Sequence, residues 1–174
     1  MSRVYLSLGS NVDPERNLGE AVRALRERFG AIDVSPTYRS AAVGFDGAPF
    51  LNSAVAFECD LDRDALHEWL HALEDASGRD RGLPRYADRT LDVDIALWCA
   101  DGGCTTDLSR AEFERAHVLA PLADLAPGLR EPFTRSALGE RWRELAPTLP
   151  KLERADQGHS CDPPNESRSD AVRK

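Results

Sequence analysis

Apolar and polar residues alternate in two stretches of the chain, residues 4–8 and residues 91–98. Because successive side chains of a strand point to opposite faces, this period of two predicts half-buried strands. The stretch 50–57 has a similar pattern and predicts a third strand. A fourth is expected over residues 32–38, where Pro36 indicates an edge position or a bulge.

Two other stretches carry apolar residues at every third or fourth position, which predicts amphipathic helices. The first follows Asp13-Pro14, a helix-capping residue and the residue favoured at the first helical position, and it ends at Gly30. The second begins after Asp62 and ends at Gly78. The resulting β-α-β-β-α-β order predicts an α/β (α+β) fold, a ferredoxin-like sandwich with both helices on one face of a mainly antiparallel sheet.

The pattern weakens after residue 103, and extra C-terminal helices are expected near residues 119–125 and 136–145. Residues 151–174 contain no Phe, Trp or Tyr and are rich in Asp, Ser, Pro and Arg, a composition typical of disorder. We therefore expect one folded domain over residues 1–150, followed by a disordered C-terminal tail.

The composition excludes several classes of protein. The 174 residues carry a formal net charge of −8, so nothing global attracts a nucleic acid, and no nucleic-acid partner is expected. No apolar run approaches the length of a membrane span, and the first residues lack a signal-peptide layout. We therefore expect a soluble, cytoplasmic protein that has no membrane partner.

The four cysteines do not form a disulfide framework, and no C-x-x-C pair is present. Cys99 and Cys104 flank a hairpin-like turn and could approach one another. Two ordinary thiols are nevertheless the expectation for a reducing compartment.

Four arginines gather directly before two aspartates, between residues 79 and 89 of an otherwise acidic chain. Asp92 and Asp94 share a strand face, with Cα atoms roughly 6–7 Å apart. Carboxylates this close repel unless a cation lies between them, and Mg²⁺ prefers such oxygen ligands together with waters and substrate phosphates. Arginines donate forked hydrogen bonds that match phosphate oxygens. Each feature alone is usually a solvated surface, but their adjacency predicts a phosphoryl-transfer site.

The same segment resembles the signature of the 6-hydroxymethyl-7,8-dihydropterin pyrophosphokinases of folate biosynthesis. In that family G-R-x-R precedes an aromatic residue and then P-R-T-L-D-L-D-I, and residues 78–95 read G-R-D-R-G-L-P-R-Y-A-D-R-T-L-D-V-D-I. Two further motifs follow the family order, Y-L-S-L-G-S-N at Tyr5–Asn11 and P-F-L-N at Pro49–Asn52. The resemblance implies Mg²⁺-dependent transfer of pyrophosphate from ATP to the pterin hydroxymethyl group, with release of AMP, by a monomer.

Carried over residue by residue, the resemblance implies three groups of site residues. The catalytic residues are Arg79, Arg89, Asp92 and Asp94, of which the two aspartates bind two Mg²⁺ ions. The ATP contacts are His71, Glu74, Arg81, Ile95 and Arg115. The pterin contacts are Ser40, Ala42, Val43, Phe50, Asn52, Tyr86 and His117, with Asn52 reading the pterin's hydrogen-bonding edge and Phe50 stacking on its face. The turn at Gly9, the loop over residues 44–49 and the loop over residues 79–88 are expected to converge beside these groups.

The chain departs from the family pattern at four places. Tyr86 stands where the family usually has Trp, and Ala87-Asp88 stands where it has Gly-Pro, which places an acid beside Arg89. A phosphate-contacting histidine of the family aligns near Ser109, and the second aromatic residue of the pterin sandwich aligns with His117. A catalytically weakened pterin- or nucleotide-binding relative is therefore the alternative interpretation.

One competing motif is present. The segment His67-Glu-Trp-Leu-His71 matches H-E-x-x-H, the signature of zinc metallopeptidases, on a predicted helix. The two histidines share a helix face and could bind a metal. They lie away from the apolar stripe, however, and no pattern for a third ligand follows, so we expect a coincidence.

Overall fold

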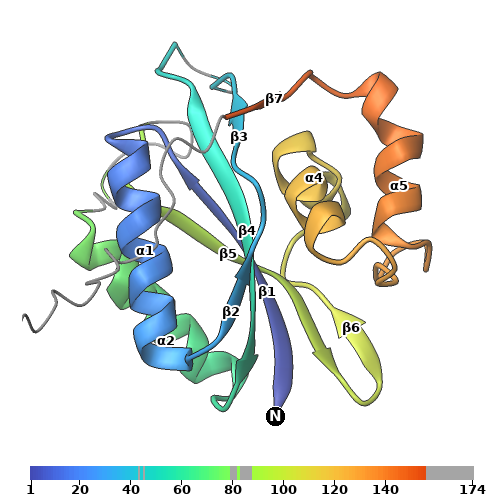
Figure 1. The fold of residues 1–174 in the computed structure, drawn as a ribbon, viewed down its shortest axis with the longest axis horizontal. Coiled ribbons are helices and arrows are strands. Elements are labelled where there is room, and N and C mark those ends of the chain that lie inside the picture. Colours follow the sequence, from blue (N-terminus) through green and yellow to red (C-terminus); the bar gives the residue numbers. More distant parts are fainter. Residues whose placement is uncertain (43, 45, 79–81, 83–87, 156–174) are drawn as a thin grey trace, which may run out of the picture.

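The structure, a computed structural model, describes residues 1–42, 44, 46–78, 82 and 88–155. Within these residues, seven strands form one antiparallel sheet in the order β6-β5-β1-β4-β3-β7, and β2 also pairs with β4 (Figure 1). The strands are β1 (Ser2–Ser10), β2 (Ile32–Val34), β3 (Tyr38–Ser40), β4 (Phe50–Cys59), β5 (Asp92–Ala100), β6 (Gly103–Thr105) and β7 (Glu153–Arg154).

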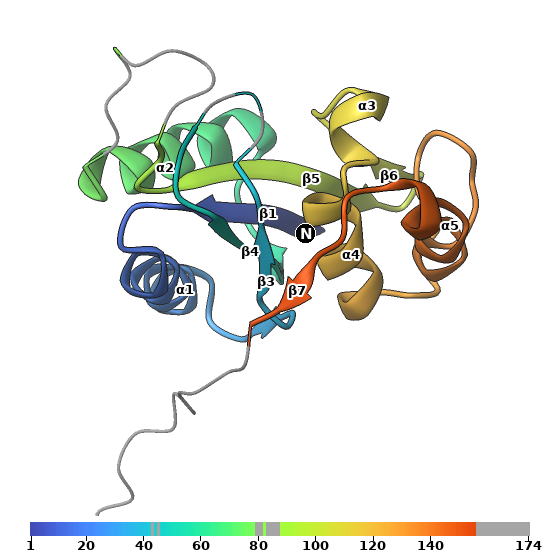
Figure 2. The ribbon, with the colours of Figure 1, turned by 90° about the horizontal axis from the view of Figure 1, so that it is seen from above.

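Helices cover both faces of this sheet (Figures 1 and 2). One face carries α1 (Pro14–Phe29) and α2 (Arg63–Ala76). The other carries α3 (Arg110–Phe113), α4 (Ala116–Leu125), α5 (Leu138–Leu145) and the 3-10 turn η1 (Ala146–Thr148). The expected α+β fold, with the first two helices on one face of an antiparallel sheet, is confirmed. None of the described helices combines the length and the apolar character that a bilayer crossing requires.

The alternation along β1 divides its side chains between two cores. Leu6 and Leu8 are fully buried against α1 and α2, whereas Tyr5 is buried on the face covered by α4. On that second face β4 presents Ala54 and Ala56. Because these side chains are short, α4 can approach β4 closely, and the interior between them is well packed.

The strand predicted over residues 32–38 is two short strands, β2 and β3, which both pair with β4. Pro36 lies in the break between them, where it has no N–H to donate. Ser35 bonds to Ala54 instead. Its backbone N–H donates to the Ala54 carbonyl oxygen (2.9 Å), and its hydroxyl accepts the Ala54 N–H (2.8 Å). The irregularity expected at Pro36 is thus present.

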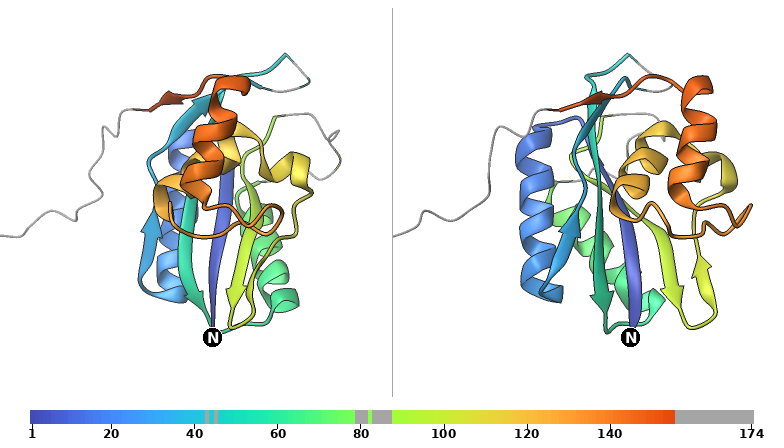
Figure 3. Two further views of the ribbon diagram at one scale, coloured as in Figure 1. Left: turned by 90° about the vertical axis from the view of Figure 1, so that its right-hand side faces the viewer. Right: turned by 45° about the vertical axis from the view of Figure 1, so that its right-hand side comes forward.

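Strand β7 lies in the segment for which the sequence predicts disorder. It pairs with β3 at the edge of the sheet, and the Ala155 N–H donates to the Thr37 carbonyl oxygen (2.9 Å) (Figure 3). Edge pairing uses backbone groups only, so a polar segment can form it without an apolar pattern. The sheet therefore extends past the boundary expected at residue 150, and residues 156–174 lie outside the described residues.

Cys99 and Cys104 form a disulfide, so the prediction of two separate thiols is wrong. The two residues are directly opposed on β5 and β6, and their Cα atoms are 4.1 Å apart. The turn at Asp101 and Gly102 folds β6 straight back along β5, which places the two side chains together. Cys59 is a free, buried thiol.

Reduction of this disulfide is expected to lower the free energy of unfolding, because the bridge restricts the unfolded chain. The loss should be only about 2 kcal/mol, because the loop that the bridge closes is short. The Cys99→Ser, Cys104→Ser double variant should then melt roughly 4–8 °C below the oxidised protein in a thermal scan. Wild-type protein scanned in excess reductant is the matched measurement. Equal melting temperatures with and without reductant would contradict a stabilising bridge.

Candidate active site

One row of directly opposed residues crosses the sheet where β1 ends and β4 and β5 begin. Asp92 on β5 is opposite Gly9 on β1, Gly9 is opposite Asn52 on β4, and Asn52 is opposite Tyr38 on β3. Opposed residues of neighbouring strands project to the same face. These four residues, which we call the cross-strand row, therefore share the face covered by α4.

Gly9 keeps the middle of the cross-strand row free of a side chain. A Cβ atom built there would lie 3.3 Å from Asn52 Oδ1 and 3.8 Å from Phe50 Cδ1. The side-chain oxygen of Asn52, Oδ1, therefore faces the space above the Gly9 backbone. A side chain at position 9 would occupy that space.

The side-chain amide of Asn52 is held in one orientation. Its Nδ2 donates to the Ser40 hydroxyl (2.9 Å) and to the Tyr38 carbonyl oxygen (3.3 Å), and the residue is 3% exposed. Both N–H groups are used, so the orientation of Oδ1 is fixed as well. No described residue donates to this Oδ1. The row thus presents a preorganised acceptor, of the kind that recognises an N–H group of a ligand.

Arg89 and Asp92 face one another at the start of β5. Arg89 Nη1 lies 3.6 Å from Asp92 Oδ1, and both side chains are partly exposed. Asp94 is exposed on the same strand face, two positions further along. The structure thus places Arg89 beside Asp92 and places Asp92 and Asp94 on one strand face, whereas Arg79 lies outside the described residues.

The start of β5 is fixed from behind by Glu74 of α2. Its buried carboxylate accepts the Val93 backbone N–H (2.9 Å), and Glu74 is 2% exposed. Val93 lies between Asp92 and Asp94, so this bond steadies the backbone that carries both aspartates.

The segment Ser10-Asn11 connects the end of β1 to the approach to β5. The Ser10 hydroxyl donates to the Thr90 carbonyl oxygen (2.6 Å), and the Asn11 backbone N–H donates to the Arg89 carbonyl oxygen (3.0 Å). Asn11 Nδ2 also donates to the Ala48 carbonyl oxygen (3.1 Å). These bonds bring the Gly9 turn, the loop that contains Ala48 and the end of the Arg-rich loop together, as the sequence predicts.

Helix α4 contributes Arg115 and His117 from the same side as the cross-strand row. The pKa of His117 is lowered to about 4, mainly by burial and also by the positive charge of Arg115, while the negative charge of Asp92 opposes the shift. Both charges therefore act on the imidazole from close by. His117 is neutral at pH 7, so it can stack on a flat ring or accept a hydrogen bond without adding charge.

The residues associated with ATP by resemblance are divided between the two sides of the sheet. His71 is exposed on α2, and Glu74 lies one turn further along the same helix. The Ile95 side chain is buried in the core under α1 and α2. Arg115 caps α4 on the opposite side, and Arg81 lies outside the described residues.

The residues associated with the pterin lie closer together. Ser40 contacts Asn52 directly, Ala42 follows the end of β3, and Phe50 is half-buried beside Gly9. Val43 and Tyr86 lie outside the described residues.

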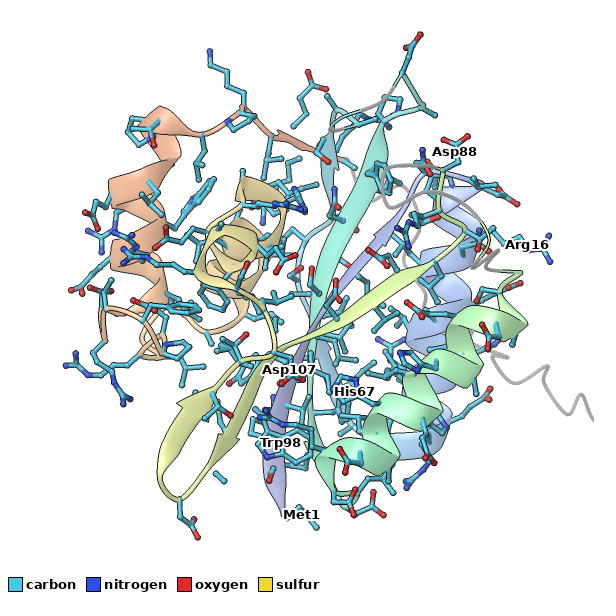
Figure 4. All side chains as sticks on the ribbon, turned by 180° about the vertical axis from the view of Figure 1, so that it is seen from behind. Met1, Arg16, His67, Asp88, Trp98 and Asp107 are labelled. Carbon is cyan, nitrogen blue, oxygen red and sulfur yellow. A yellow bond between two sulfur atoms is a disulfide. The ribbon has the colours of Figure 1, made fainter. Side chains whose placement is uncertain are left out.

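His67 of the H-E-x-x-H motif bonds to an aspartate. Its Nε2 lies 2.9 Å from Asp107 Oδ2, and Arg63 Nη1 lies 2.7 Å from Asp107 Oδ1 (Figure 4). The His67 and His71 ring centroids are 6.2 Å apart. Within the described ranges, no three His, Cys, Asp or Glu side chains gather as metal ligands. The motif therefore connects α2 to the segment after β6.

The structure also adds Tyr38, which sequence reasoning did not single out. Its hydroxyl donates to Asp124 Oδ2 (2.5 Å), so β3 is joined to α4 at the cross-strand row. Burial and this hydrogen bond raise the pKa of Tyr38 to about 12. The sequence indicates Tyr38 only through its position two residues before Ser40. That position places Tyr38 on the same strand face as Ser40, but it points to Asn52 only when the pairing of β3 with β4 is known.

The sheet and the helices on its two faces define a small α+β protein, with polar and charged side chains gathered at one edge. A model of the 7,8-dihydro-6-hydroxymethylpterin-pyrophosphokinase (HPPK) family matches residues 5–127, from β1 to just beyond α4. The match includes every residue of the cross-strand row. The chain therefore belongs to the HPPK family.

Three curated relatives carry the name 2-amino-4-hydroxy-6-hydroxymethyldihydropteridine pyrophosphokinase. The chain is 39% identical to the protein of Pseudomonas aeruginosa over 142 residues, which cover 76% of this chain and 85% of that protein. It is 37% identical to the Bacillus subtilis protein over 128 residues, 70% of this chain and 76% of that protein. The Methylorubrum extorquens protein is 37% identical over 138 residues, 74% of this chain and 85% of that protein.

Proposed function

We propose that this chain transfers pyrophosphate from ATP to the hydroxymethyl group of 6-hydroxymethyl-7,8-dihydropterin, releasing AMP, in folate biosynthesis. The observation that carries the proposal is the family match over residues 5–127, which contains the fixed Asn52 amide and the Arg89–Asp92 pair. A pyrophosphokinase needs an acceptor for a flat heterocycle and a charged site for a triphosphate, and these groups meet both requirements.

In this proposal the pterin binds on the α4 side of the cross-strand row. Asn52 Oδ1 accepts a ring N–H, because its amide is already oriented by Ser40 and Tyr38. Phe50 and the neutral His117 stack on the ring. Ala42, Val43 and Tyr86 complete the pocket by resemblance.

The two aspartates at the start of β5 suit Mg²⁺. Asp92 and Asp94 offer hard carboxylate oxygens from one face of a strand that Glu74 steadies, and Mg²⁺ takes its remaining ligands from waters and phosphates. We expect them to hold two Mg²⁺ ions. When bound, Mg²⁺ supplies positive charge that offsets the negative charge of the triphosphate.

The arginines act on the charge that develops during transfer. The pterin hydroxymethyl oxygen releases its proton to solvent and bonds to the β-phosphorus of ATP. The bond between that phosphorus and the oxygen that bridges it to the α-phosphorus breaks, and AMP leaves with this oxygen. Arg89 and Arg79 donate hydrogen bonds to the phosphoryl oxygens in the transition state. His71, Glu74, Arg81, Ile95 and Arg115 lie along the nucleotide by resemblance.

A second candidate function is binding of the same ligands without efficient turnover. Ser109, near the aligned position of the family's phosphate-contacting histidine, is the N-cap of α3. Its hydroxyl donates to Glu112 Oε2 (2.7 Å) and accepts the Glu112 N–H (3.3 Å). This capping box engages the serine hydroxyl inside the protein. It supplies no positive charge to a phosphate.

A coupled assay separates the two candidates. Purified protein with ATP, Mg²⁺ and the pterin is expected to form AMP and pterin diphosphate in equal amounts, and omission of any one component should stop AMP formation. Calorimetry with a non-hydrolysable ATP analogue, Mg²⁺ and the pterin reports binding separately. Binding without AMP supports the second candidate, and folded protein that neither binds nor reacts contradicts both.

We further propose that the enzyme acts as a monomer in the cytoplasm, because one chain supplies every group named above and ATP is abundant there.

A further inference from the structure

Asn11 uses its whole side-chain amide at the end of β1. Nδ2 donates to Asp88 Oδ1 (2.7 Å) and to the Ala48 carbonyl oxygen (3.1 Å), and Oδ1 accepts the Arg89 backbone N–H (2.7 Å). The Asn11 backbone N–H also donates to the Arg89 carbonyl oxygen (3.0 Å). Asn11 is 5% exposed, so these bonds are protected from competing water.

We propose that Asn11 and Asp88 are positioning residues, and that the hydrogen bond between them is a latch that holds Arg89 against Asp92. The role of the latch in catalysis rests on the proposed function. Nothing in it requires Asp88 to touch substrate. Figure 4 shows Asp88 at the end of the sheet where β5 begins.

The geometry explains how such a latch acts. Arg89 is clamped through both its backbone N–H and its carbonyl oxygen by Asn11, and its Nη1 lies 3.6 Å from Asp92 Oδ1. The clamp depends on which way the Asn11 amide faces, since only Oδ1 can accept the Arg89 N–H. Asp88 and the Ala48 carbonyl oxygen favour that orientation together, because both groups can only accept and therefore select the Nδ2 end of the amide. The bond is also charge-assisted, the stronger kind of hydrogen bond.

Asp88 is the position at which this chain departs from the family motif. Ala87-Asp88 stands where the motif has Gly-Pro, and proline has no side-chain acceptor to offer. Read alone, the sequence places an unwanted acid next to a phosphate-binding arginine. The contact with Asn11 gives this carboxylate a different task, that of accepting a hydrogen bond from Asn11 Nδ2.

Four variants test the latch in the full chain. Asp88→Ala removes the acceptor and is expected to lower kcat/KM for ATP about tenfold. Asp88→Asn keeps an acceptor oxygen without the charge and should recover activity to within about threefold of wild type. Asn11→Ala should lose more than Asp88→Ala, because it also releases Arg89 and Ala48. The double variant should be no worse than Asn11→Ala, since Asp88 acts through Asn11.

Glu15→Ala is the matched control. Glu15 is an exposed acid in the first turn of α1, and the structure gives its carboxylate no hydrogen-bond or ion-pair partner in the described part of the chain. The control should leave kcat/KM unchanged, which separates loss of the latch from loss of one surface charge. If Asp88→Asn were as impaired as Asp88→Ala, or if the two single losses multiplied in the double variant, the latch would be wrong.

Amide hydrogen exchange tests the latch without any turnover. The Arg89 N–H is expected to exchange about tenfold faster in Asp88→Ala than in wild type, and at nearly the wild-type rate in Asp88→Asn. If the protein forms no AMP but shows this exchange pattern, the proposed function is contradicted and the latch is supported. Equal Arg89 exchange in all the proteins overturns the latch even if the enzyme is active.

Discussion

Asp94→Asn is expected to lower kcat by about 10³-fold while leaving the fold intact. The substitution removes one of the two carboxylates proposed to hold Mg²⁺ against the triphosphate, and charge stabilisation is the main source of catalysis in phosphoryl transfer. Asp94 is exposed on β5, so an isosteric amide costs little stability. Initial rates over a range of Mg²⁺ concentrations, with a thermal melt for the fold, provide the measurement.

The hairpin turn offers a matched control for this result. Asp101→Asn makes the same chemical change at an exposed position beyond the far end of β5 and should leave kcat unchanged. If a well-folded Asp94→Asn protein keeps more than a tenth of wild-type kcat at saturating Mg²⁺, Asp94 is not a Mg²⁺ ligand that catalysis requires.

Gly9→Ala is expected to weaken pterin binding about 100-fold. The added methyl group would lie 3.3 Å from Asn52 Oδ1, in the space that faces the acceptor. Asn52 cannot swing aside cheaply, because its Nδ2 is bound to Ser40 and to the Tyr38 carbonyl oxygen. The methyl group therefore blocks the acceptor, and a ligand that loses a matched buried hydrogen bond binds far more weakly.

Calorimetry of pterin binding, in the presence of Mg²⁺ and an ATP analogue, measures this effect. Affinity for the ATP analogue alone should change by less than about threefold, since Gly9 faces Asn52. Gly19→Ala is the control: Gly19 lies in α1 with no atom within 4 Å of an added Cβ, and this change should only stabilise the helix, by about 0.5–1 kcal/mol. Pterin affinity in Gly9→Ala within fivefold of wild type would exclude the proposed binding face.

The elements that the sequence predicts well are those whose two sides meet different surroundings. Helices α1 and α2 have one face on the sheet and one in solvent, so their apolar stripes are clear. Helix α4 is predicted only in part, because it lies between the sheet and α5 and seven of its ten residues are buried, Pro121 among them. A helix buried on most sides shows little periodicity. Strand β7 carries no pattern at all, since backbone pairing with β3 defines it.

The candidate site divides in the same way. That Asp92 and Asp94 share a face follows from their spacing alone, and the structure bears it out. The cross-strand row could not be read from the sequence, because the opposition of Gly9 with Asn52 and Asp92 depends on strand register. The bond between Asn11 and Asp88 joins residues 77 positions apart, and nothing in the sequence near either residue predicts that they are in contact.

Strand β7 is synthesised long after β3, the strand with which it pairs. Arg154 of β7 is directly opposed to Tyr38 of β3, whose carbonyl oxygen helps to orient Asn52. The outer neighbour of β3 therefore comes from nearly the last residues described. While a nascent chain is still on the ribosome, β3 has a bare outer edge, and such edges invite pairing with other chains. Translation of β7 covers that edge, so a segment that is synthesised late in the described part of the chain protects a strand that is synthesised earlier.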